Sequence, residues 1–281
     1  MSLLTNALRT VFDVATKRQP PQAAAADLAG GSEASIAVPE PGGAAPAWKL
    51  LGTETGVQDM AYGDLARPGV QRLFARPPRR LLDVGCATGA VGADLKKTIP
   101  GLWVWGCELN EEAARTAATR LDHVTSVPRE RWSEADLTAV RTVDTVLLLD
   151  VLEHMYNPWA ELQFLARNLP KDAQVIVSLP NIGHCDVLQA LSYGRFPYAA
   201  MGILDVTHVR FFTYEGMFEL FDDTGFLVEQ SWMLSQSPHE PIQTFPAEVK
   251  AGKVTLQVDS AEEWERLNTV QFGFRLRRKP A

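Results

Sequence analysis

The sequence contains few cysteines, and the three that it has do not suggest disulfides. Cys86, Cys107 and Cys185 form an odd set with no Cys-x-x-Cys spacing. This pattern is typical of proteins in a reducing compartment and argues against a disulfide framework. We therefore expect a cytoplasmic protein.

Long apolar runs, a secretory signal and an excess of positive charge are also missing. The longest apolar run, residues 143–152, is interrupted by Asp144 and Asp150, so we expect no integral membrane segment. No basic stretch precedes an apolar core near the first residue, so no secretory signal is predicted. The 27 Lys and Arg against 34 Asp and Glu give a net charge of −7. Nucleic acid is not an expected partner, because it normally requires a basic face.

The first 47 residues differ from the rest of the chain. Residues 1–19 predict an amphipathic helix, with one face formed by Leu4, Leu8, Val11, Phe12 and Ala15. This helix would dock on its own domain, on a second subunit or on another partner through residues 1–18, or on a membrane surface. Residues 20–47 contain ten Ala, five Pro, four Gly and no aromatic residue, which indicates a flexible linker. The folded domain is expected to span 48–281.

From residue 80 the chain alternates between strand and helix patterns. Strands are predicted over residues 81–84, 102–107, 143–149, 174–179, 226–232 and 269–276. Helices are predicted over residues 90–99, 111–121, 158–169, 213–223 and 261–267. Repeated strand–helix units predict an α/β fold in which helices cover both faces of a parallel sheet.

A glycine-containing turn follows the first strand in LLDVGCATGA, residues 81–90. Such a turn commonly binds a nucleotide-like ligand. A triphosphate loop requires Lys-Ser or Lys-Thr where this chain has Val91-Gly92. Ala87 replaces the bare glycine that lets a backbone approach a pyrophosphate. A nucleoside ligand that carries an amino-acid tail and no phosphate is more compatible with the methyl group of Ala87. Glu108 follows at the end of the next strand, where its carboxylate can accept both ribose hydroxyls. NAD remains an alternative.

Five segments occur in order along the chain: LLDVGCATGA, CELN, LLLDVLEHMYNPW, SLPNIGH and GILDVTHVRFFT. Over roughly residues 60–278 they resemble class I S-adenosylmethionine-dependent methyltransferases, and most of all a bacterial branch with LPN…H and ILDxTHxRFFT motifs. The resemblance implies a Rossmann-like, seven-stranded, mostly parallel sheet with an antiparallel last strand and helices on both faces. It also implies S-adenosyl-L-methionine as the cofactor.

The resemblance assigns cofactor contacts to matching positions. The methionine end would lie at Asp83, Gly85, Ala87 and Gly89, the ribose at Glu108 with Leu109 beside it, and the sulfonium at Asp150 and Val151. The acidic residue that often contacts the adenine cannot be aligned. Trp132, Glu134 and Asp136 are the candidates for that contact.

Three histidines are candidates for the chemistry. A hydroxyl acceptor must lose a proton, and imidazole suits this task at neutral pH. His154, His184 and His208 fall in loops that leave the carboxyl edge of the predicted sheet, where ligands bind. We expect His208 to act as base or to orient the acceptor. The alternatives are a backbone contact for His154, a place in a lid for His184 and simple packing for His208. The three histidines together with Asp150 or Asp205 could bind a divalent metal, but no metal is expected, because the spacing lacks a compact ligand motif.

Residues 183–212 are predicted to form a lid over the acceptor. Its candidate contacts, together with the preceding amide, are Asn181, Tyr193, Phe196, Tyr198 and Arg210. The aromatic rings suit a sugar or a flat aromatic acceptor, whereas Arg210 would bind an anion or pair with Asp205. The expected function is O-methylation of a small polar acceptor, such as a sugar hydroxyl of a glycan or glycosylated metabolite. The alternatives are an N- or C-methyltransferase acting on a secondary metabolite, and a cofactor-binding module without catalysis.

Overall fold

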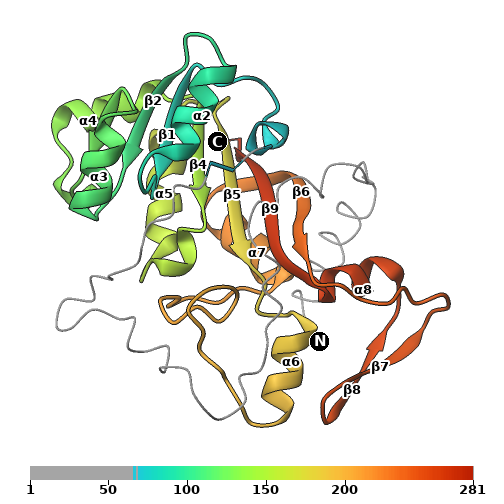
Figure 1. Cartoon of the computed structure of the whole chain (residues 1–281). Coiled ribbons are helices and arrows are strands. Elements are labelled where there is room, and N and C mark those ends of the chain that lie inside the picture. Colours follow the sequence, from blue (N-terminus) through green and yellow to red (C-terminus); the bar gives the residue numbers. More distant parts are fainter. Residues whose placement is uncertain (1–65, 68, 281) are drawn as a thin grey trace.

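The computed structural model describes residues 66–67 and 69–280 (Figure 1). The predicted helix over 1–19, the predicted linker over 20–47 and the first part of the expected domain lie outside the described residues. Within the described part of the chain, no helix combines the length and the apolar character that crossing a membrane requires.

The centre of the molecule is a seven-stranded sheet in the order β3-β2-β1-β4-β5-β9-β6 (Figure 1). The strands are β1 Arg80–Val84, β2 Trp103–Cys107, β3 His123–Thr125, β4 Thr145–Leu149, β5 Gln174–Pro180, β6 Phe226–Gln236 and β9 Thr269–Arg278. The first five strands pair in parallel, and β9 runs antiparallel to both β5 and β6. The predicted Rossmann-like sheet with an antiparallel last strand is confirmed.

Helices follow the strands. They are α2 Ala90–Thr98, α3 Glu111–Ala118, α4 Glu134–Ala139, α5 Pro158–Asn168, α6 Cys185–Ser192, α7 Tyr214–Asp223 and α8 Ala261–Leu267. Two of them, α4 and α6, were not predicted. Two predicted caps are confirmed. The side chain of Asn157 accepts the N–H of Ala160 at 3.1 Å before α5, and the hydroxyl of Thr213 accepts the N–H of Gly216 at 3.1 Å before α7. Each such cap stabilises its helix by about 1 kcal/mol.

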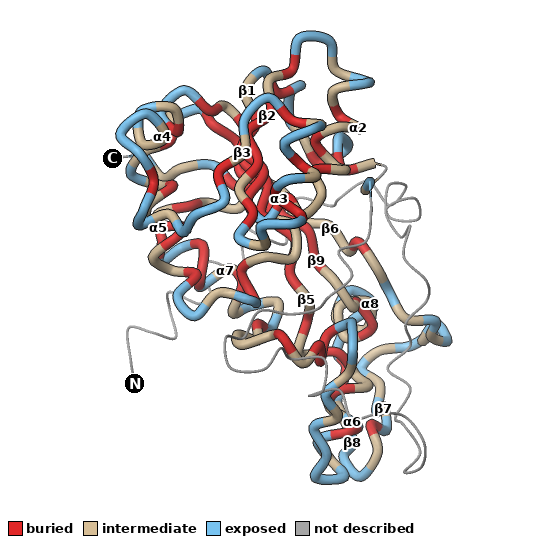
Figure 2. The backbone as a smooth tube through the Cα atoms, turned by 60° about the vertical axis from the view of Figure 1, so that its left-hand side comes forward, coloured by how far each residue is buried: buried red, intermediate tan, exposed pale blue. Residues whose placement is uncertain are grey.

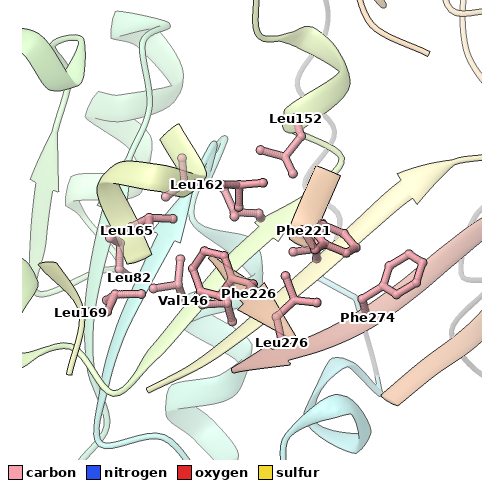
Figure 3. Packing of buried hydrophobic residues seen from close by; sticks show 14 of the residues in the cluster. Leu82, Val146, Leu152, Leu162, Leu165, Leu169, Phe221, Phe226, Phe274 and Leu276 are labelled. Carbon is pink, nitrogen blue, oxygen red and sulfur yellow. The ribbon is translucent and has the colours of Figure 1, made fainter. Parts of the chain in front are cut away.

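Alternating side chains of the strands form two apolar layers. Leu82 and Val146 face α5 and α7, where they pack near Leu165 and Phe221 (Figure 3). The neighbouring Leu81 faces the other side, in a cluster with residues of α2 and α3. Figure 2 shows the buried residues concentrated along the central strands. Burying each such leucine stabilises the fold by roughly 1.5–3 kcal/mol. The loops of the site therefore extend from a stable sheet.

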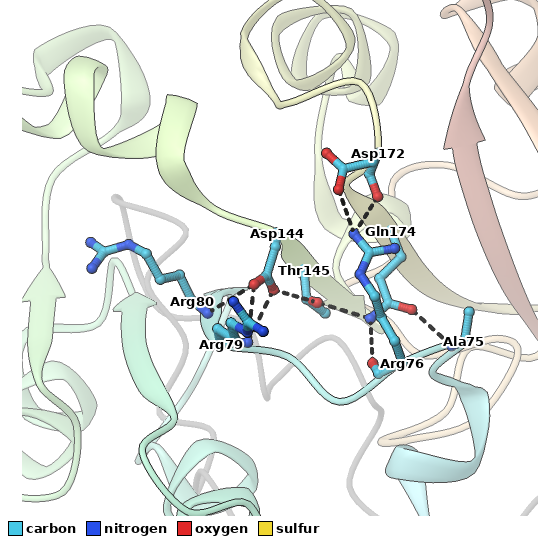
Figure 4. A network of polar contacts seen from close by, with 8 residues as sticks. All are labelled: Ala75, Arg76, Arg79, Arg80, Asp144, Thr145, Asp172 and Gln174. Atoms are coloured by element: carbon cyan, nitrogen blue, oxygen red, sulfur yellow. Dashed lines mark hydrogen bonds and ion pairs between the residues drawn. The ribbon is translucent and has the colours of Figure 1, made fainter.

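A polar network ties together the amino ends of β1, β4 and β5 (Figure 4). The Asp144 carboxylate accepts the N–H of Arg79 at 3.0 Å and the hydroxyl of Thr145 at 3.0 Å. The Gln174 amide donates to the Thr145 hydroxyl at 3.0 Å and accepts the N–H of Ala75 at 2.8 Å. These contacts stabilise the amino ends of the strands. Ligands of such sheets bind at the opposite edge, where the parallel strands have their carboxyl ends.

A small hairpin outside the main sheet was not predicted. It consists of β7 (Ala247–Ala251) and β8 (Val254–Val258), and it lies beside α6 (Figure 1). At its tip, the N–H of Lys253 donates to the hydroxyl of Ser192 at 2.9 Å. The hairpin therefore packs on the end of α6 and extends the molecule beyond the carboxyl ends of the strands.

Candidate active site

The turn after β1 has a backbone conformation that glycine adopts most readily. Gly85 and Gly89 have φ values of 69° and 77°, and Ala87 between them has a φ of 48°. A non-glycine residue pays roughly 1–3 kcal/mol for this left-handed conformation. The N–H of Ala87 donates to Glu108 Oε2 at 3.0 Å, and the N–H of Gly85 donates to the Cys107 carbonyl at 2.8 Å. The turn is thus tied to the end of β2.

Replacing Gly85 with alanine is expected to lower the free energy of unfolding by about 2–4 kcal/mol. The new methyl group would meet Val151 Cγ2 at 2.6 Å in addition to the strained φ. Gly101 provides the control, because its φ is 77° and, among the described residues beyond its chain neighbours, no atom lies within 4 Å of the position of an added Cβ. Urea denaturation should therefore show a larger loss for Gly85→Ala than for Gly101→Ala. Equal losses would mean that the close approach of Val151 has no energetic weight.

Glu108 and Leu109 form the adjacent wall at the end of β2. Glu108 is buried, and its carboxylate accepts the N–H of Ala87 through one oxygen and the N–H of Asn110 at 2.7 Å through the other. Each oxygen keeps capacity for a second donor. Leu109 is 64 % exposed. The Glu108 carboxylate, which can accept hydrogen bonds from hydroxyl groups, and the apolar surface of Leu109 therefore lie next to the glycine turn.

Asp83 is a buried carboxylate with one oxygen that lacks a partner. Its exposed fraction is 3 %, and its Oδ2 has no hydrogen-bond partner among the described residues. Burial raises the pKa of Asp83 to about 7, although the charge of Arg67 acts in the opposite direction. Leaving such an oxygen unpaired costs about 1–3 kcal/mol. An ammonium group of a ligand would remove this cost, so Asp83 fits the amino-acid tail of a nucleoside ligand.

Replacing Asp83 with asparagine is expected to stabilise the ligand-free protein at pH 8 by roughly 2–4 kcal/mol. The pKa of Asp83 is raised, so the folded state favours the protonated form, and wild-type stability is lost as the pH rises from about 4 through about 7. Asparagine carries no charge at any of these pH values. In urea denaturation, the difference in free energy of unfolding between the two proteins should become smaller as the pH falls towards 4. A difference that does not change with pH would contradict the raised pKa of Asp83.

Asp150, at the end of β4, is held by three side chains. Its carboxylate accepts the hydroxyl of Ser178 at 2.8 Å, the amide of Gln271 and the guanidinium of Arg67. Burial alone would raise the pKa of Asp150, but the charge of Arg67 and these hydrogen bonds outweigh burial and hold the pKa below its usual value. Asp150 has a φ of 56°. It is thus an ionised carboxylate at the same edge as the glycine turn, with Val151 directly beside Gly85.

A second group of polar side chains lies next to Asp150. It consists of Glu153, His154 and His208, whose potential ligand atoms all lie within 4.8 Å of one another, and we call it the Glu–His–His cluster. Glu153 and His154 belong to the 3-10 helix η5 (Leu152–His154), and His208 comes from the segment after α6. The rings of the two histidines are 4.8 Å apart, edge to face.

Backbone contacts orient both histidine rings. Nδ1 of His208 lies 3.0 Å from the Ile203 carbonyl, so it carries the proton and leaves Nε2 free to accept one. Nδ1 of His154 lies 3.0 Å from the hydroxyl of Thr207 and 3.3 Å from its carbonyl. Burial lowers the pKa of His208, with the charge of His154 adding to this effect and the contact to Ile203 opposing it. The neutral ring is therefore favoured.

Glu153 is the residue of this cluster that the sequence analysis missed. Its exposed fraction is 1 %, and its Oε2 has no partner among the described residues. Burial, reinforced by the charge of Asp150, raises the pKa of Glu153 well above its usual range. Its backbone carbonyl accepts the N–H groups of Val209 at 2.9 Å and Arg210 at 3.0 Å, which fastens the His208 segment to η5. An acidic residue inside the apolar run LLLDVLEHM was the available signal.

The structure gives His184 and Asn181 structural contacts. His184 is fully buried, and its Nδ1 accepts the N–H of Asp186 at 3.1 Å as the cap of α6. The Asn181 side chain accepts the N–H of Gly183 at 2.9 Å and donates to the Thr269 carbonyl at 2.9 Å. It also donates to the carbonyl of Arg266 at 3.1 Å. The amide of Asn181 is thus fully used in joining β5 to β9.

The predicted lid residues divide into two groups. The ring of Phe196 lies 5.2 Å from that of Tyr198 and 5.5 Å from that of Phe211, which in turn is 6.4 Å from the His208 ring. Tyr193 lies instead on the hairpin side, with the ammonium of Lys253 at 5.4 Å from its ring. Phe196 and Tyr198 are therefore connected to the Glu–His–His cluster, whereas Tyr193 is not.

Arg210 also differs from one of its predicted alternatives. Its guanidinium donates to the Val209 carbonyl at 2.9 Å and to the Tyr156 carbonyl. Among the described residues it forms no ion pair with Asp205, whose carboxylate accepts the N–H of Thr207 at 2.8 Å. The predicted pairing with Asp205 is thus wrong, because the loop carbonyls take the guanidinium.

None of the three adenine candidates offers a free acidic group at this edge. Trp132 is buried, and its ring lies 4.8 Å from that of Trp105 in the core. Asp136 forms the capping box of α4 with Ser133. Glu134 lines a surface hollow together with Arg80, which lies at the amino end of β1. We retain none of the three as an adenine ligand.

Comparisons with known proteins identify a family. Residues 60–231 match the family model described as "Methyltransferase domain". No curated protein matches the chain. Similar solved structures include magnesium protoporphyrin IX methyltransferase of Synechocystis PCC 6803 with bound SAH (15 % identity, 72 % of this chain and 75 % of that chain, TM-score 0.46). Another is a possible histamine N-methyltransferase of Thermotoga maritima (16 % identity, 78 % and 90 %, TM-score 0.48).

Proposed function

The chain belongs to the methyltransferase-domain family and is an S-adenosylmethionine-dependent methyltransferase, and from this premise we propose that it methylates a hydroxyl oxygen of a small polar acceptor. A sugar hydroxyl of a glycan or of a glycosylated metabolite is the acceptor class we favour. The observation that carries the proposal is the Glu–His–His cluster beside Asp150, because a hydroxyl must lose a proton on methylation and imidazole nitrogen can promote that loss.

The residues at the carboxyl edge fit the cofactor. S-adenosylmethionine supplies a methyl group on a positively charged sulfur, which makes the carbon open to direct displacement. Asp83 would receive the ammonium of the methionine end through its unpaired Oδ2, and Glu108 would accept the ribose hydroxyls. Gly85 and Val151 bring the turn close to the end of β4, where Asp150 would lie on the sulfonium side. Leu109 supplies an exposed apolar surface for the nucleoside.

The acceptor would enter from the side of the Glu–His–His cluster. Phe196 and Tyr198 project exposed aromatic surface there and contact His208 through Phe211. Aromatic rings stack on the apolar faces of sugars while hydroxyl groups remain free for polar contacts. In this arrangement His208 and His154 act on the acceptor hydroxyl. We leave His184 out of the catalytic set and Asn181 out of the acceptor contacts, since both are committed to structural hydrogen bonds.

An acceptor panel tests the proposal. Sugars and glycosides with free hydroxyl groups are compared with their deoxy and amino analogues in a transfer assay with methyl-labelled S-adenosylmethionine. We expect label only on acceptors that present a hydroxyl at the methylated position. Transfer to the amino analogues at an equal or higher rate would favour the N-methyltransferase alternative. The amide of Asn181, a polar group that could hold a nitrogen acceptor, is engaged in hydrogen bonds within this fold.

We further propose that the enzyme works in the cytoplasm of a bacterial cell. The support is that Cys86, Cys107 and Cys185 are all free thiols. Burial raises the pKa of the Cys185 thiol to about 11, which keeps it protonated and unreactive at neutral pH. The Cys185 thiol therefore has no part in the proposed reaction.

A further inference from the structure

We propose that Glu153, His154 and His208 bind a divalent transition-metal cation, and that this cation holds and ionises the acceptor hydroxyl. The role of the cation in catalysis rests on the proposed O-methylation, whereas its binding does not. The sequence analysis expected no metal, because 54 positions separate His154 from His208 and no compact motif joins them. The fold removes that separation by fastening the His208 segment to η5 through the Glu153 carbonyl.

The spacing of the ligand atoms suits one ion. All three lie within 4.8 Å of one another. Three ligand atoms that each lie about 2.1 Å from one ion are mutually separated by at most about 3.6 Å. From the printed limit of 4.8 Å, an inward movement of at most roughly 0.7 Å by each ligand atom would reach this spacing. Two imidazole nitrogens with one carboxylate oxygen also form a known ligand set for divalent metals that keeps further positions open.

The unpaired oxygen of Glu153 points independently to a ligand. Its side chain is almost fully buried, and Oε2 has no donor in the described part of the chain. A carboxylate oxygen in such surroundings is costly unless it is paired with a charge or coordinates a metal. The Arg67 guanidinium, which would be an obvious partner, is bound to Asp150 instead. A cation between Glu153 and the two histidines would supply the missing partner.

The histidines are oriented as metal ligands usually are. Metal-binding imidazoles commonly use their second nitrogen for a backbone or carboxylate contact that fixes the ring. Nδ1 of His208 has such a contact with Ile203, and Nδ1 of His154 has one with Thr207. The N–H of Thr207 in turn donates to Asp205 at 2.8 Å. Both Nε2 atoms therefore remain available while a network of backbone contacts holds the rings.

A second group, His184 with Cys185 and Asp186, is less suited to a metal. Its potential ligand atoms are also close together. However, Nδ1 of His184 already accepts the N–H of Asp186, and the Cys185 thiol donates to Asn268 at 3.2 Å. Nε2 of His184 has no partner among the described residues, but the Cys185 thiol that would complete the set is engaged. The cluster beside Asp150 is better suited, because it offers an unpaired carboxylate oxygen together with two imidazole rings.

The cation would act by lowering the pKa of a bound hydroxyl. One acceptor hydroxyl, with a neighbouring hydroxyl as a second ligand, would occupy open positions on the ion. Its O–H bond breaks and the proton passes to solvent water. The alkoxide oxygen then forms a bond to the methyl carbon as the carbon–sulfur bond breaks, and the sulfur leaves as a neutral thioether with the electron pair. No oxidant or reductant is needed.

Metal binding can be measured without any acceptor. Untagged full-length protein is stripped with a chelator and titrated with Mn²⁺, and the free ion is followed by electron paramagnetic resonance. We expect one saturable Mn²⁺ site per chain and electron spin-echo modulation from histidine nitrogen. Glu153→Gln and His208→Ala should each weaken binding by about tenfold or more. His239→Gln is the matched control, because His239 also lies beside a carboxylate, 3.4 Å from Glu265, but outside the cluster.

The outcomes separate this proposal from the proposed function. Absence of saturable Mn²⁺ binding by the wild-type protein would overturn the metal site, whether or not the variants fold. Binding that Glu153→Gln leaves unchanged, in a variant with wild-type circular dichroism, would also overturn it. A saturable site with histidine nitrogen, together with transfer only to nitrogen or carbon, would uphold the site and refute O-methylation. Full O-methylation activity in excess chelator would refute the catalytic role of the cation alone.

Discussion

Replacing His208 with alanine is expected to lower the turnover number by about 100-fold or more, while the affinity for S-adenosylmethionine changes by less than about threefold. His208 belongs to the Glu–His–His cluster on the proposed acceptor side. Its Nδ1 is bound to the Ile203 carbonyl, which leaves Nε2 available either to accept the acceptor's proton or to bind the proposed cation, and alanine removes both roles. The proposed cofactor contacts are Asp83 in β1 and Glu108 after β2, which belong to other elements of the fold than His208. Initial rates and calorimetry on the same preparation measure the two quantities.

His239→Ala serves as the control for this substitution. His239 also carries an imidazole beside a carboxylate, and it contacts the ring of Trp264 rather than the cluster. Its turnover number should stay near that of the wild type. If His208→Ala turned over at the wild-type rate with a genuine acceptor, His208 would have no catalytic role. If its cofactor affinity fell in parallel with turnover, the loss would reflect a damaged fold instead.

Replacing Glu108 with alanine is expected to weaken S-adenosylmethionine binding by about 100-fold. The carboxylate accepts the N–H of Ala87 in the glycine turn and the N–H of Asn110 before α3. Its removal therefore loses the proposed ribose contact and also leaves these two N–H groups without their acceptor. Hydrogen bonds to a charged group contribute about 1.5–3 kcal/mol each, and about 2.7 kcal/mol corresponds to a 100-fold change. Isothermal titration calorimetry with the cofactor measures the dissociation constant directly.

A nearby glutamate provides the comparison. Glu111 lies in the first turn of α3 with a side chain that is 85 % exposed, so Glu111→Ala should leave the dissociation constant unchanged. Glu108→Gln keeps an acceptor oxygen for one of the two N–H groups and should fall between the alanine variant and the wild type. A dissociation constant that is the same for Glu108→Ala and the wild type would show that the ribose is bound elsewhere.

The fold could be predicted from sequence because its strands and caps have strong local signals. Strand β4, Thr145–Leu149, and strand β5, Gln174–Pro180, are buried on both faces, so each is an almost continuous apolar run. Asn157 and Thr213 marked helix starts through side-chain contacts that involve only neighbouring residues. Strand β3 was missed because three residues, one of them exposed, are too short for a recognisable period.

The site could be predicted only where it depends on local sequence. The glycine turn and Glu108 follow directly from strand ends, and the structure brings them together through the N–H of Ala87. The grouping of Glu153 with His208 depends on two backbone hydrogen bonds between distant segments, which no local pattern reveals. For Asn181, the local sequence suggested a functional role where the fold shows structural hydrogen bonds. Its polar side chain suggested an acceptor contact, but the fold uses it to join β5 and β9.

The most direct test of hydroxyl methylation at this site is the chemical position of the transferred methyl group. The wild-type enzyme is incubated with S-adenosylmethionine labelled with ¹³C in the methyl group and with the acceptor that the panel identifies. The product is then examined by ¹³C NMR. We expect a single new methoxyl carbon that is lost with His208→Ala and retained with His239→Ala. A methyl group bonded to nitrogen or carbon, or a methoxyl product formed equally well by both variants, would contradict the proposed reaction.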